Sequence, residues 1–249
     1  MNRLSLLAAA LSVLLVACKQ APSGPFPTIT FSSPVGRTLT VSLINHGSLA
    51  MTYGDTSLQI DPVGKFRDKV IDYSSFGKAD AIFVTHEHGD HLSPATIEAL
   101  SDADTRVFLN PMGWHKCEKG DSLRPGESVV LSMRISAQAV EAYNTTLGRE
   151  KFHPKGNGYG LVLDFDGLKV YVSGDTEDIP EMANLGNIDV AFLSVNQPYT
   201  MTPEQCVHAA ELIHPRVLIP YHTGGTNLLS ITSALKHSGI EVRTYDSLR

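Results

Sequence analysis

Positive charge, cysteine and long apolar runs are all scarce in this 249-residue sequence. Its 20 Lys and Arg against 26 Asp and Glu form no basic cluster, which argues against nucleic acid as a partner. Beyond the N-terminal region no apolar run is long enough to cross a membrane, so we expect membrane contact only through the N-terminus. Of the three cysteines, Cys117 and Cys206 could form a disulfide in an exported chain, or Cys206 could be a free thiol on the buried face of a helix.

Residues 1–17 have the features of a secretory signal. Arg3 supplies the positive charge, an apolar stretch follows, and Cys18 comes directly after it. This arrangement resembles the lipobox of bacterial lipoproteins, which implies cleavage before Cys18 and lipidation of that cysteine. The proline-containing residues 18–27 then form a tether. We expect an exported lipoprotein on the periplasmic or extracellular face of a membrane; the alternatives are a plain signal peptide cut nearby and an uncleaved anchor.

The most informative stretch is Ala81 to Leu92, where an apolar run of strand length ends in a turn rich in histidine and carboxylate. Three of the ten histidines and two acidic residues fall within residues 86–91. These side chains suit zinc, iron and manganese, and a tight turn after a buried strand can direct several of them to one point. The turn therefore predicts a metal site, against the simpler alternative of a solvated polar turn.

Other strand-like segments also end in polar residues that could complete such a site. Asp175 and His222 follow buried strands, as the histidine turn does. His46 and Asp61 stand at two earlier strand ends. His46 could contact a metal ligand or substrate or be structural, and Asp61 could orient a ligand or form a turn. The long polar loop 145–158 is expected to be functional or disordered.

Periodicity predicts one domain, residues 28–249, built mainly of strands. The alternating pattern of residues 28–63 predicts three or four antiparallel strands. A strand at 79–84, a helix from Pro94 to about Leu100 and a strand at 106–109 form a βαβ-like unit in a mixed sheet. Residues 121–140 return to a strand-like pattern, with predicted strands at 129–131 and 135–142. The other predicted strands lie at 160–165, 169–172, 188–195, 216–222 and 241–245, and the other helices begin near Thr202 and Leu228.

The histidine turn resembles the H-x-H-x-D-H signature of the metallo-β-lactamase superfamily. Residues 173–176 and 220–222 stand in the order of two later metal motifs of that superfamily, so the resemblance spans residues 39–245. Residues 60–62 and 198–201 are similar to the branch that includes ascorbate-6-phosphate lactonase-like and N-acyl phosphatidylethanolamine phospholipase D-like proteins. The resemblance implies an α/β fold, a four-layer αββα sandwich with the site along one edge of its two sheets.

The resemblance also implies two divalent metal ions, with zinc expected first and manganese or iron as alternatives. A metal-bound hydroxide would be the nucleophile, and Asp90 could shuttle the proton. Gln197 and Tyr199 are candidates for the substrate rim. Carried over position by position, the implied ligands are His86 and His88 for the first ion, Asp90, His91 and His222 for the second, and Asp175 as the bridge.

One expected ligand is missing from its usual place. The superfamily normally has a histidine after the strand that here ends in Ala142-Tyr143-Asn144. We interpret His153, nine residues beyond Asn144 in the following loop, as the substitute ligand. The alternative is a looser first site that is weakly occupied or filled by water.

The favoured function is metal-dependent hydrolysis of an ester, lactone or phosphodiester in a small-molecule or lipid-like substrate, and the oligomeric state is left open. Genuine β-lactamase activity is less attractive, because Asp175 stands where many such enzymes carry a cysteine. An iron redox enzyme on this fold would need a flavin domain that this length does not hold. A non-enzymatic metal-binding surface lipoprotein should have broken ligands, whereas six of the seven expected positions match.

Overall fold

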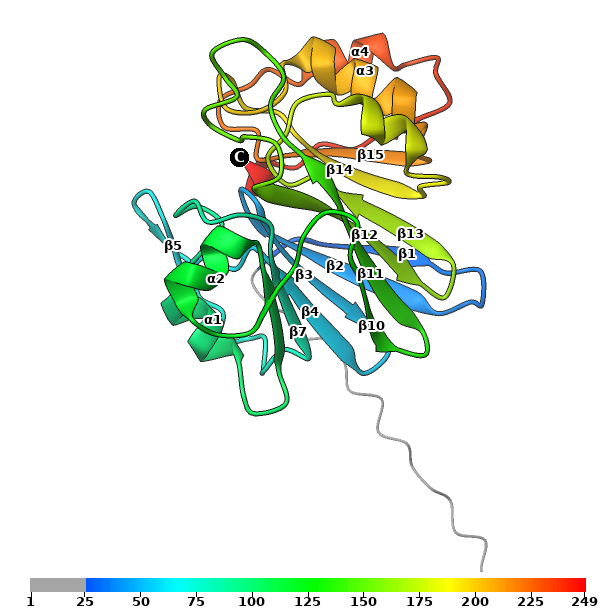
Figure 1. Cartoon of the computed structure of the whole chain (residues 1–249). Coiled ribbons are helices and arrows are strands. Elements are labelled where there is room, and N and C mark those ends of the chain that lie inside the picture. The colour runs from blue at the N-terminus through cyan, green and yellow to red at the C-terminus, as the bar shows by residue number, and fades with distance from the viewer. Residues whose placement is uncertain (1–25) are drawn as a thin grey trace, which may run out of the picture.

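The computed structural model describes residues 26–249, coloured from blue to red in Figure 1. The predicted signal peptide, the lipidation site Cys18 and most of the tether lie outside the described residues. The last two tether residues contact the domain: the Phe26 ring stacks on Phe76 with centroids 5.6 Å apart, and the Pro27 carbonyl accepts a hydrogen bond from the Leu43 amide at 2.8 Å. None of the helices among the described residues has both the length and the apolar character that a membrane crossing requires.

The first half of the chain forms a seven-stranded mixed sheet in the order β1-β2-β3-β4-β7-β8-β9 (Figure 1). β1 to β4 are antiparallel, as the alternating pattern predicted, and β4, β7, β8 and β9 are parallel. The strands are β1 (Thr28–Ser32), β2 (Thr38–Asn45), β3 (Ser48–Tyr53), β4 (Thr56–Ile60), β7 (Ala81–Val84), β8 (Arg106–Leu109) and β9 (Asp121–Ser122). A small separate hairpin, β5 (Lys65–Phe66) with β6 (Lys69–Val70), lies between β4 and β7 in the chain.

The second half repeats this arrangement in the order β10-β11-β12-β13-β14-β15-β16. β10 to β13 are again antiparallel, and β13 to β16 are parallel. The strands are β10 (Ser128–Ser132), β11 (Ile135–Ala142), β12 (Gly158–Phe165), β13 (Leu168–Val172), β14 (Val190–Ser194), β15 (Val217–Tyr221) and β16 (Glu241–Val242). The predicted last strand, 241–245, therefore ends three residues early.

Three of the four α-helices among the described residues begin at a capping side chain. Ser93 caps α1 (Pro94–Leu100), and Thr202 with Gln205 forms a capping box at α3 (Pro203–Ile213). Asn110 caps α2 (Pro111–Cys117), a helix that the sequence analysis did not predict because its short Pro-Met-Gly-Trp start lacks apolar periodicity. The remaining helical segments are α4 (Leu229–Ala234) and the 3₁₀ turns η1 (Pro180–Asn184) and η2 (Asp246–Leu248).

Three apolar clusters give the molecule four layers, which confirms the predicted αββα sandwich. The largest cluster lies between the two sheets and includes Phe83 and Phe108 of the first sheet with Phe165 and Phe192 of the second. The other two clusters lie under α1 on one outer face and under α3 and α4 on the other (Figure 1).

The two cysteines among the described residues are free thiols, so the disulfide alternative is wrong. Cys206 is fully buried in the cluster under α3, where burial raises the pKa of its thiol. Cys117 is half-buried on α2, on the far outer face of the other sheet. The two sulfur atoms thus belong to opposite outer layers of the sandwich.

Candidate metal centre

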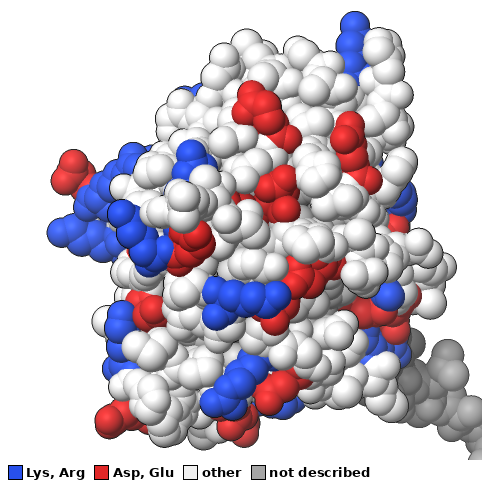
Figure 2. All heavy atoms as spheres, turned by 45° about the horizontal axis from the view of Figure 1, so that its top comes forward, with Lys and Arg blue, Asp and Glu red and all other residues white. Residues whose placement is uncertain are grey.

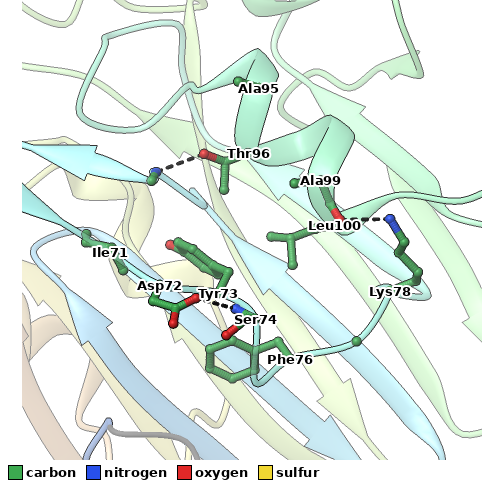
Figure 3. A pocket seen from close by; sticks show the side chains of 12 residues that line it. Ile71, Asp72, Tyr73, Ser74, Phe76, Lys78, Ala95, Thr96, Ala99 and Leu100 are labelled. Atoms are coloured by element: carbon green, nitrogen blue, oxygen red, sulfur yellow. Dashed lines mark hydrogen bonds between the residues drawn. The ribbon is translucent and has the colours of Figure 1, made fainter.

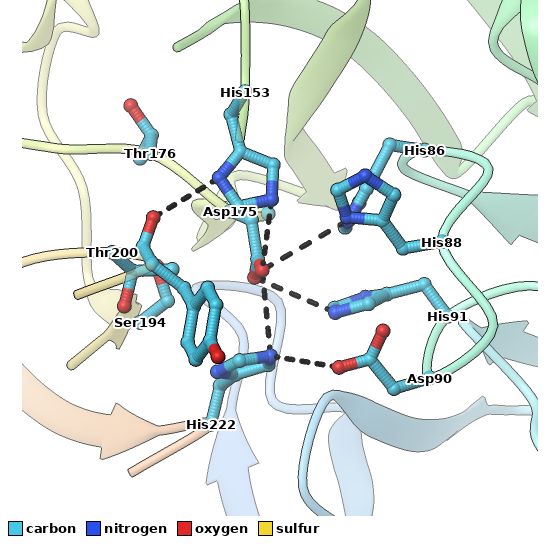
Figure 4. A network of polar contacts seen from close by, with 12 residues as sticks. His86, His88, Asp90, His91, His153, Asp175, Thr176, Ser194, Thr200 and His222 are labelled. Carbon is cyan, nitrogen blue, oxygen red and sulfur yellow. Dashed lines mark hydrogen bonds and ion pairs between the residues drawn. The ribbon is translucent and has the colours of Figure 1, made fainter. Parts of the chain in front are cut away.

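The predicted ligands meet at one edge of the sandwich, where parallel strands of both sheets end (Figure 4). The histidine turn follows β7, Asp175 follows β13 and His222 follows β15. Because the carboxyl ends of neighbouring parallel strands lie along the same sheet edge, residues far apart in the sequence converge there. The structure brings together all seven predicted ligands: His86, His88, Asp90, His91, His153, Asp175 and His222.

Asp175 lies at the centre of this cluster. Its Oδ2 atom is 3.3 Å from His153 Nε2, 3.4 Å from His222 Nε2 and 3.9 Å from His86 Nε2. Its Oδ1 atom is 3.5 Å from His91 Nε2. One buried carboxylate therefore faces histidines from both sides, which is the position that a bridging ligand requires.

The ligand atoms fall into three groups, each with its members within 4.8 Å of one another. The first group contains His86, His88 and His153, and the second contains His86, His91 and Asp175. His46, Asp90 and His222 form the third group. These His and Asp groups have the donor chemistry of a metal site.

Unsatisfied buried atoms give an independent test of whether metal ions fit. Nε2 of His91, His153 and His222 and Oδ1 of Asp175 are buried and form no hydrogen bond within the described part of the chain. Such atoms are uncommon in native proteins because each costs roughly 1–3 kcal/mol of desolvation. All four lie in the cluster around Asp175, where a shared cation would satisfy them.

The protonation states of two of the histidines, His153 and His222, suit metal binding. Burial, then the positive charge of neighbouring His88, lowers the pKa of His153 to about 3. Burial likewise lowers the pKa of His222 to about 3, although the Asp90 carboxylate, 3.5 Å from Nε2, opposes it. Both imidazoles are thus neutral at physiological pH, and the neutral form is the one that ligates metals. At His91 burial is outweighed by the Asp175 and Asp61 carboxylates, which raise its pKa to about 10, so a metal ion there would displace a proton.

His153 reaches the cluster from the loop between β11 and β12, as the sequence analysis predicted. Its Nδ1–H donates to the Tyr199 carbonyl at 3.0 Å, which directs Nε2 toward Asp175. Asn144 does not take part in the cluster. Its amide donates to the same Tyr199 carbonyl at 2.7 Å and to the Arg149 carbonyl at 3.2 Å, so it fixes the loop that carries His153.

Glu177, which the sequence analysis did not single out, anchors the same loop. Its side chain is fully buried, and Oε2 accepts hydrogen bonds from the Thr145 amide at 2.8 Å, the Thr145 hydroxyl at 3.0 Å and the Thr146 amide at 2.6 Å. Arg149 pairs with Oε1 at 3.3 Å. The only signal for Glu177 in the sequence is that an acidic residue stands two positions after the motif aspartate, Asp175. That signal does not indicate that the side chain is buried.

Asp61 orients His91. Its Oδ2 accepts from His91 Nδ1–H at 2.8 Å and from the Thr85 hydroxyl at 2.8 Å, while Oδ1 accepts from the Thr85 amide at 2.7 Å. A carboxylate on Nδ1 fixes the ring so that Nε2 faces Asp175. This contact is the orienting one that the sequence analysis considered for Asp61.

His46 lies closer to the cluster than an ordinary structural histidine would. Its Nε2 is 3.4 Å from Asp90 Oδ2, and its ring centroid is 3.6 Å from that of His222. His46, Asp61 and His222 all have left-handed backbone, with φ of 49°, 47° and 53°. Such strained residues concentrate at functional sites.

Gly47 is required by the close approach of this turn to His91. A Cβ atom at position 47 would lie 2.7 Å from His91 Cε1. Any side chain there would displace the imidazole that Asp61 orients. The His46-Gly47 turn is therefore shaped around the ligand cluster.

Asp90 is the most open of the acidic ligands, with 36% of its side chain exposed. Burial raises its pKa, but the imidazoles of His222 and His46, whose Nε2 atoms lie 3.5 Å and 3.4 Å from Oδ2, outweigh burial and hold the pKa well below its ordinary value. Asp175 behaves differently: burial raises its pKa to about 7, against the opposing charge of His91. Asp90 is therefore ionised at all physiological pH values.

Glu87, the remaining acidic residue of the turn, points away from the cluster. Its carboxylate accepts from Asn110 at 2.8 Å and from Asn157 at 3.0 Å, and Lys116 donates to its carbonyl at 2.9 Å. Glu87 therefore links the turn to the N-terminus of α2 and to the β11–β12 loop.

A cavity of about 320 Å³ opens onto the metal cluster. Tyr199 lines it, as predicted, but Gln197 does not: its amide donates to the Thr200 carbonyl at 2.6 Å. The lining residues are His46, Phe66, Arg67, His88, Asp90, Phe152, His153, Asp175, Asn196, Tyr199 and His222.

A larger hollow of about 580 Å³ lies beside α1 and is mainly apolar (Figure 3). Its two charged residues are already engaged, since Lys78 donates to the Ala99 carbonyl at 2.9 Å and Asp72 accepts from the Ser74 amide at 2.8 Å. No cluster of metal-binding side chains faces it among the described residues. The chemistry therefore belongs to the smaller cavity.

Comparison with known proteins agrees with this geometry. The profile of the family described as beta-lactamase superfamily domain matches residues 40–222. A UPF0173 metal-dependent hydrolase of Thermococcus onnurineus is 30% identical over 154 residues, covering 58% of this chain and 67% of the relative. A UPF0173 metal-dependent hydrolase of Thermococcus kodakarensis is 28% identical over 73% of this chain and 83% of the relative.

Solved structures show the same fold. A metal-dependent hydrolase candidate of Parabacteroides distasonis is 47% identical, with a TM-score of 0.85 over 89% of this chain and 99% of that one. Igni18, a metallo hydrolase of Ignicoccus hospitalis, is 21% identical, with a TM-score of 0.67 over 85% of this chain and 96% of that one.

Proposed function

We propose that this chain, which belongs to the beta-lactamase superfamily domain family, hydrolyses an ester, lactone or phosphodiester bond. By homology it is a metal-dependent hydrolase of the UPF0173 group. One observation carries the proposal: the Asp175 carboxylate lies between His91, His153 and His222, whose Nε2 atoms form no hydrogen bond within the described residues.

In this proposal, the chain's residues hold two divalent ions, with zinc expected first and manganese or iron as alternatives. When bound, the ions would supply Lewis acidity and a water molecule of lowered pKa. Asp61 keeps His91 in the required tautomer, and the Tyr199 carbonyl does the same for His153. The ligand sets are His86, His88 and His153 for the first ion, Asp90, His91 and His222 for the second, and Asp175 for both.

Asp90 is our proposed proton shuttle because it is the more exposed of the two ligand carboxylates that line the cavity. The nearby imidazoles of His222 and His46 make it a weak base, so it would hold a proton only transiently. The walls around it contain Phe66, Phe152 and Tyr199. These rings would exclude water from the substrate, which strengthens electrostatic interactions at the reacting bond.

The test is a substrate panel with added Zn²⁺ or Mn²⁺, containing a phosphodiester, a lactone and an aryl ester. We expect hydrolysis of at least one, lost with a chelator. Asp175→Asn should reduce kcat by more than about 100-fold, beyond the 10–100-fold typical of residues that only orient a ligand. The control is Asp178→Asn, since Asp178 pairs with the exposed His208 at 2.7 Å. Full activity of Asp175→Asn would exclude a shared carboxylate.

We also propose that the protein is an exported lipoprotein attached to a membrane through Cys18. The support is the sequence of residues 1–18 alone. Metabolic labelling with palmitate should mark the wild-type chain and not a Cys18→Ser variant; equal labelling of both would exclude the site.

A further inference from the structure

The β5–β6 hairpin is held over the metal cluster by an aromatic contact. The Phe66 ring stacks on the His46 ring with centroids 4.1 Å apart. Strand pairing of Lys65 with Val70 and a hydrogen bond from the Ile71 amide to the Gly64 carbonyl at 2.9 Å close the base of the hairpin. Its tip is therefore fixed beside the cavity.

Arg67 occupies the first position of this tip in a left-handed conformation, with φ of 53°. Two-residue hairpin turns favour Asn, Asp or Gly at such positions, because a longer side chain is strained there by about 1 kcal/mol or more. A costly residue at a site mouth points to a role for its side chain.

The guanidinium of Arg67 is available for a ligand. It lies 5.0 Å from the centroid of the Phe66 ring, and no ion pair to it exists within residues 26–249. It is the only lysine or arginine among the residues that line the metal cavity. Figure 2 shows Lys and Arg side chains gathered on the projecting edge where Figure 1 places β5, and the exposed cations of the hairpin are Lys65, Arg67 and Lys69.

Part of the cavity wall is aromatic. Phe152 and Tyr199 meet edge to face with centroids 5.1 Å apart, and both line the cavity. A volume of about 320 Å³ is near the lower end of the range for ligand sites, so the reacting part of the substrate is small.

We propose that Arg67 binds an anionic group of the substrate and so determines substrate specificity. This inference rests on the proposed function. The substrate is then a small ester or lactone with an aryl or alkyl part against Phe152 and Tyr199. Its second, non-reacting carboxylate or phosphate lies at Arg67. A charge-assisted hydrogen bond of this kind is worth about 1.5–3 kcal/mol, or roughly 10- to 100-fold in affinity.

Two esters of matched size test this: 4-nitrophenyl hemisuccinate, which is anionic, and 4-nitrophenyl butyrate, which is neutral. Arg67→Ala should lower kcat/KM for the hemisuccinate about 10- to 100-fold, mainly through KM, and for the butyrate less than about 2-fold. Arg67→Lys should lie between wild type and Arg67→Ala for the hemisuccinate. Lys69→Ala is the matched control, because Lys69 is an exposed cation of the same hairpin that does not line the cavity. Equal losses for both esters in Arg67→Ala, or the same selective loss in Lys69→Ala, would overturn the proposal.

A binding measurement separates failure of this inference from failure of the proposed function. Calorimetry of the metal-loaded protein with benzoate and with benzamide needs no turnover. We expect benzoate to bind more tightly, and Arg67→Ala to remove about 10-fold or more of its affinity. Unchanged benzoate affinity in Arg67→Ala would exclude Arg67 as the anion site, whether or not either ester is cleaved.

Discussion

Asp61 shows how one buried side chain prepares a ligand for a metal. It is completely buried, and its two carboxylate oxygens accept from the Thr85 amide, the Thr85 hydroxyl and His91 Nδ1–H. The two hydrogen bonds from Thr85 hold in place the carboxylate to which His91 donates. The orientation of His91 therefore depends on the end of β7, where the histidine turn begins.

Replacing Asp61 by Asn should weaken metal binding by about 10- to 100-fold, because the amide no longer fixes the tautomer of His91. Competition with a chromogenic chelator would measure the zinc affinity. Asp80→Asn is a matched control, because Asp80 also accepts from an amide and a hydroxyl, both of Ser57, but on the exposed surface. Equal zinc affinity of the Asp61 variant and the control would remove Asp61 from the metal centre.

Replacing His153 by Ala should reduce the metal content from two ions per chain to about one. The reason is that His153 completes the group with His86 and His88, while the Asp90–His222 side of the cluster keeps its own ligands. Elemental analysis of purified protein measures this. His208→Ala, which removes an exposed histidine paired with Asp178, should retain both ions, and unchanged content in the His153 variant would exclude it as a ligand.

At the residue level, metal ligands could be predicted from the sequence where they stand close together in it. His86, His88, Asp90 and His91 lie within six positions, and strand ends identified Asp175 and His222. The contacts of Arg67 and Glu177 depend instead on a hairpin and a loop that fold back over the site. No local pattern encodes such contacts, because neither residue lies at the end of a predicted strand. Gln197 does not line the cavity, and its amide donates within its own turn.

At the level of elements, the β11–β12 loop differs from the other parts of the site because its ligand does not follow a strand end. It supplies a ligand from residue 153 rather than from a strand end, so an anchor must replace the rigidity of a strand. Glu177 provides that anchor through its bonds to Thr145, Thr146 and Arg149. Sequence predicted the strands on either side well, because alternation and the Asp166-Gly167 turn are local signals. The short helix α2 has no comparable signal.

Replacing Glu177 by Gln should lower the occupancy of the first metal site without removing the second ion. The amide nitrogen would face donors that now bond to a carboxylate oxygen, so the loop would lose its anchor and His153 its position. Metal titration followed by elemental analysis gives the readout.

Glu181→Gln is the control for this variant. Glu181 accepts from Lys155 of the same loop at 2.8 Å, but its side chain is 35% exposed, so the pair contributes little. We expect Glu181→Gln to keep both ions. A Glu177 variant that also binds two ions with wild-type affinity would show that the loop is positioned without it.

At the scale of the whole molecule, the metal cluster joins the two sheets. His86, His88 and His91 follow a strand of the first sheet, and Asp175 and His222 follow strands of the second. Hydrogen bonds also cross between the halves. Among them, the Tyr53 hydroxyl donates to Asp166 at 2.9 Å, and the Tyr159 hydroxyl donates to the Phe108 carbonyl at 3.1 Å. The four-layer architecture could be predicted from the family resemblance, whereas these cross-links depend on how the sheets face each other.

Metal binding should therefore stabilise the entire fold, because the ligands are close together only when both sheets are packed. At a free metal concentration about 1,000 times Kd, the linkage amounts to about 4 kcal/mol for each bound ion, or about 8 kcal/mol for two. For a chain of this size, two ions correspond to a rise in Tm of roughly 20 °C. Thermal unfolding followed by circular dichroism, with zinc and with a chelator, measures the difference.

The His153→Ala variant makes this prediction specific to the junction between the sheets. With one ion remaining, its chelator-sensitive shift in Tm should be about half that of the wild type, whereas His208→Ala should show the full shift. Since His208 lies on the outer surface of one layer, its loss removes a histidine without touching the junction. A wild-type Tm that does not respond to the chelator, in protein shown to carry metal beforehand, would mean that the ligands hold the ion without coupling the two sheets.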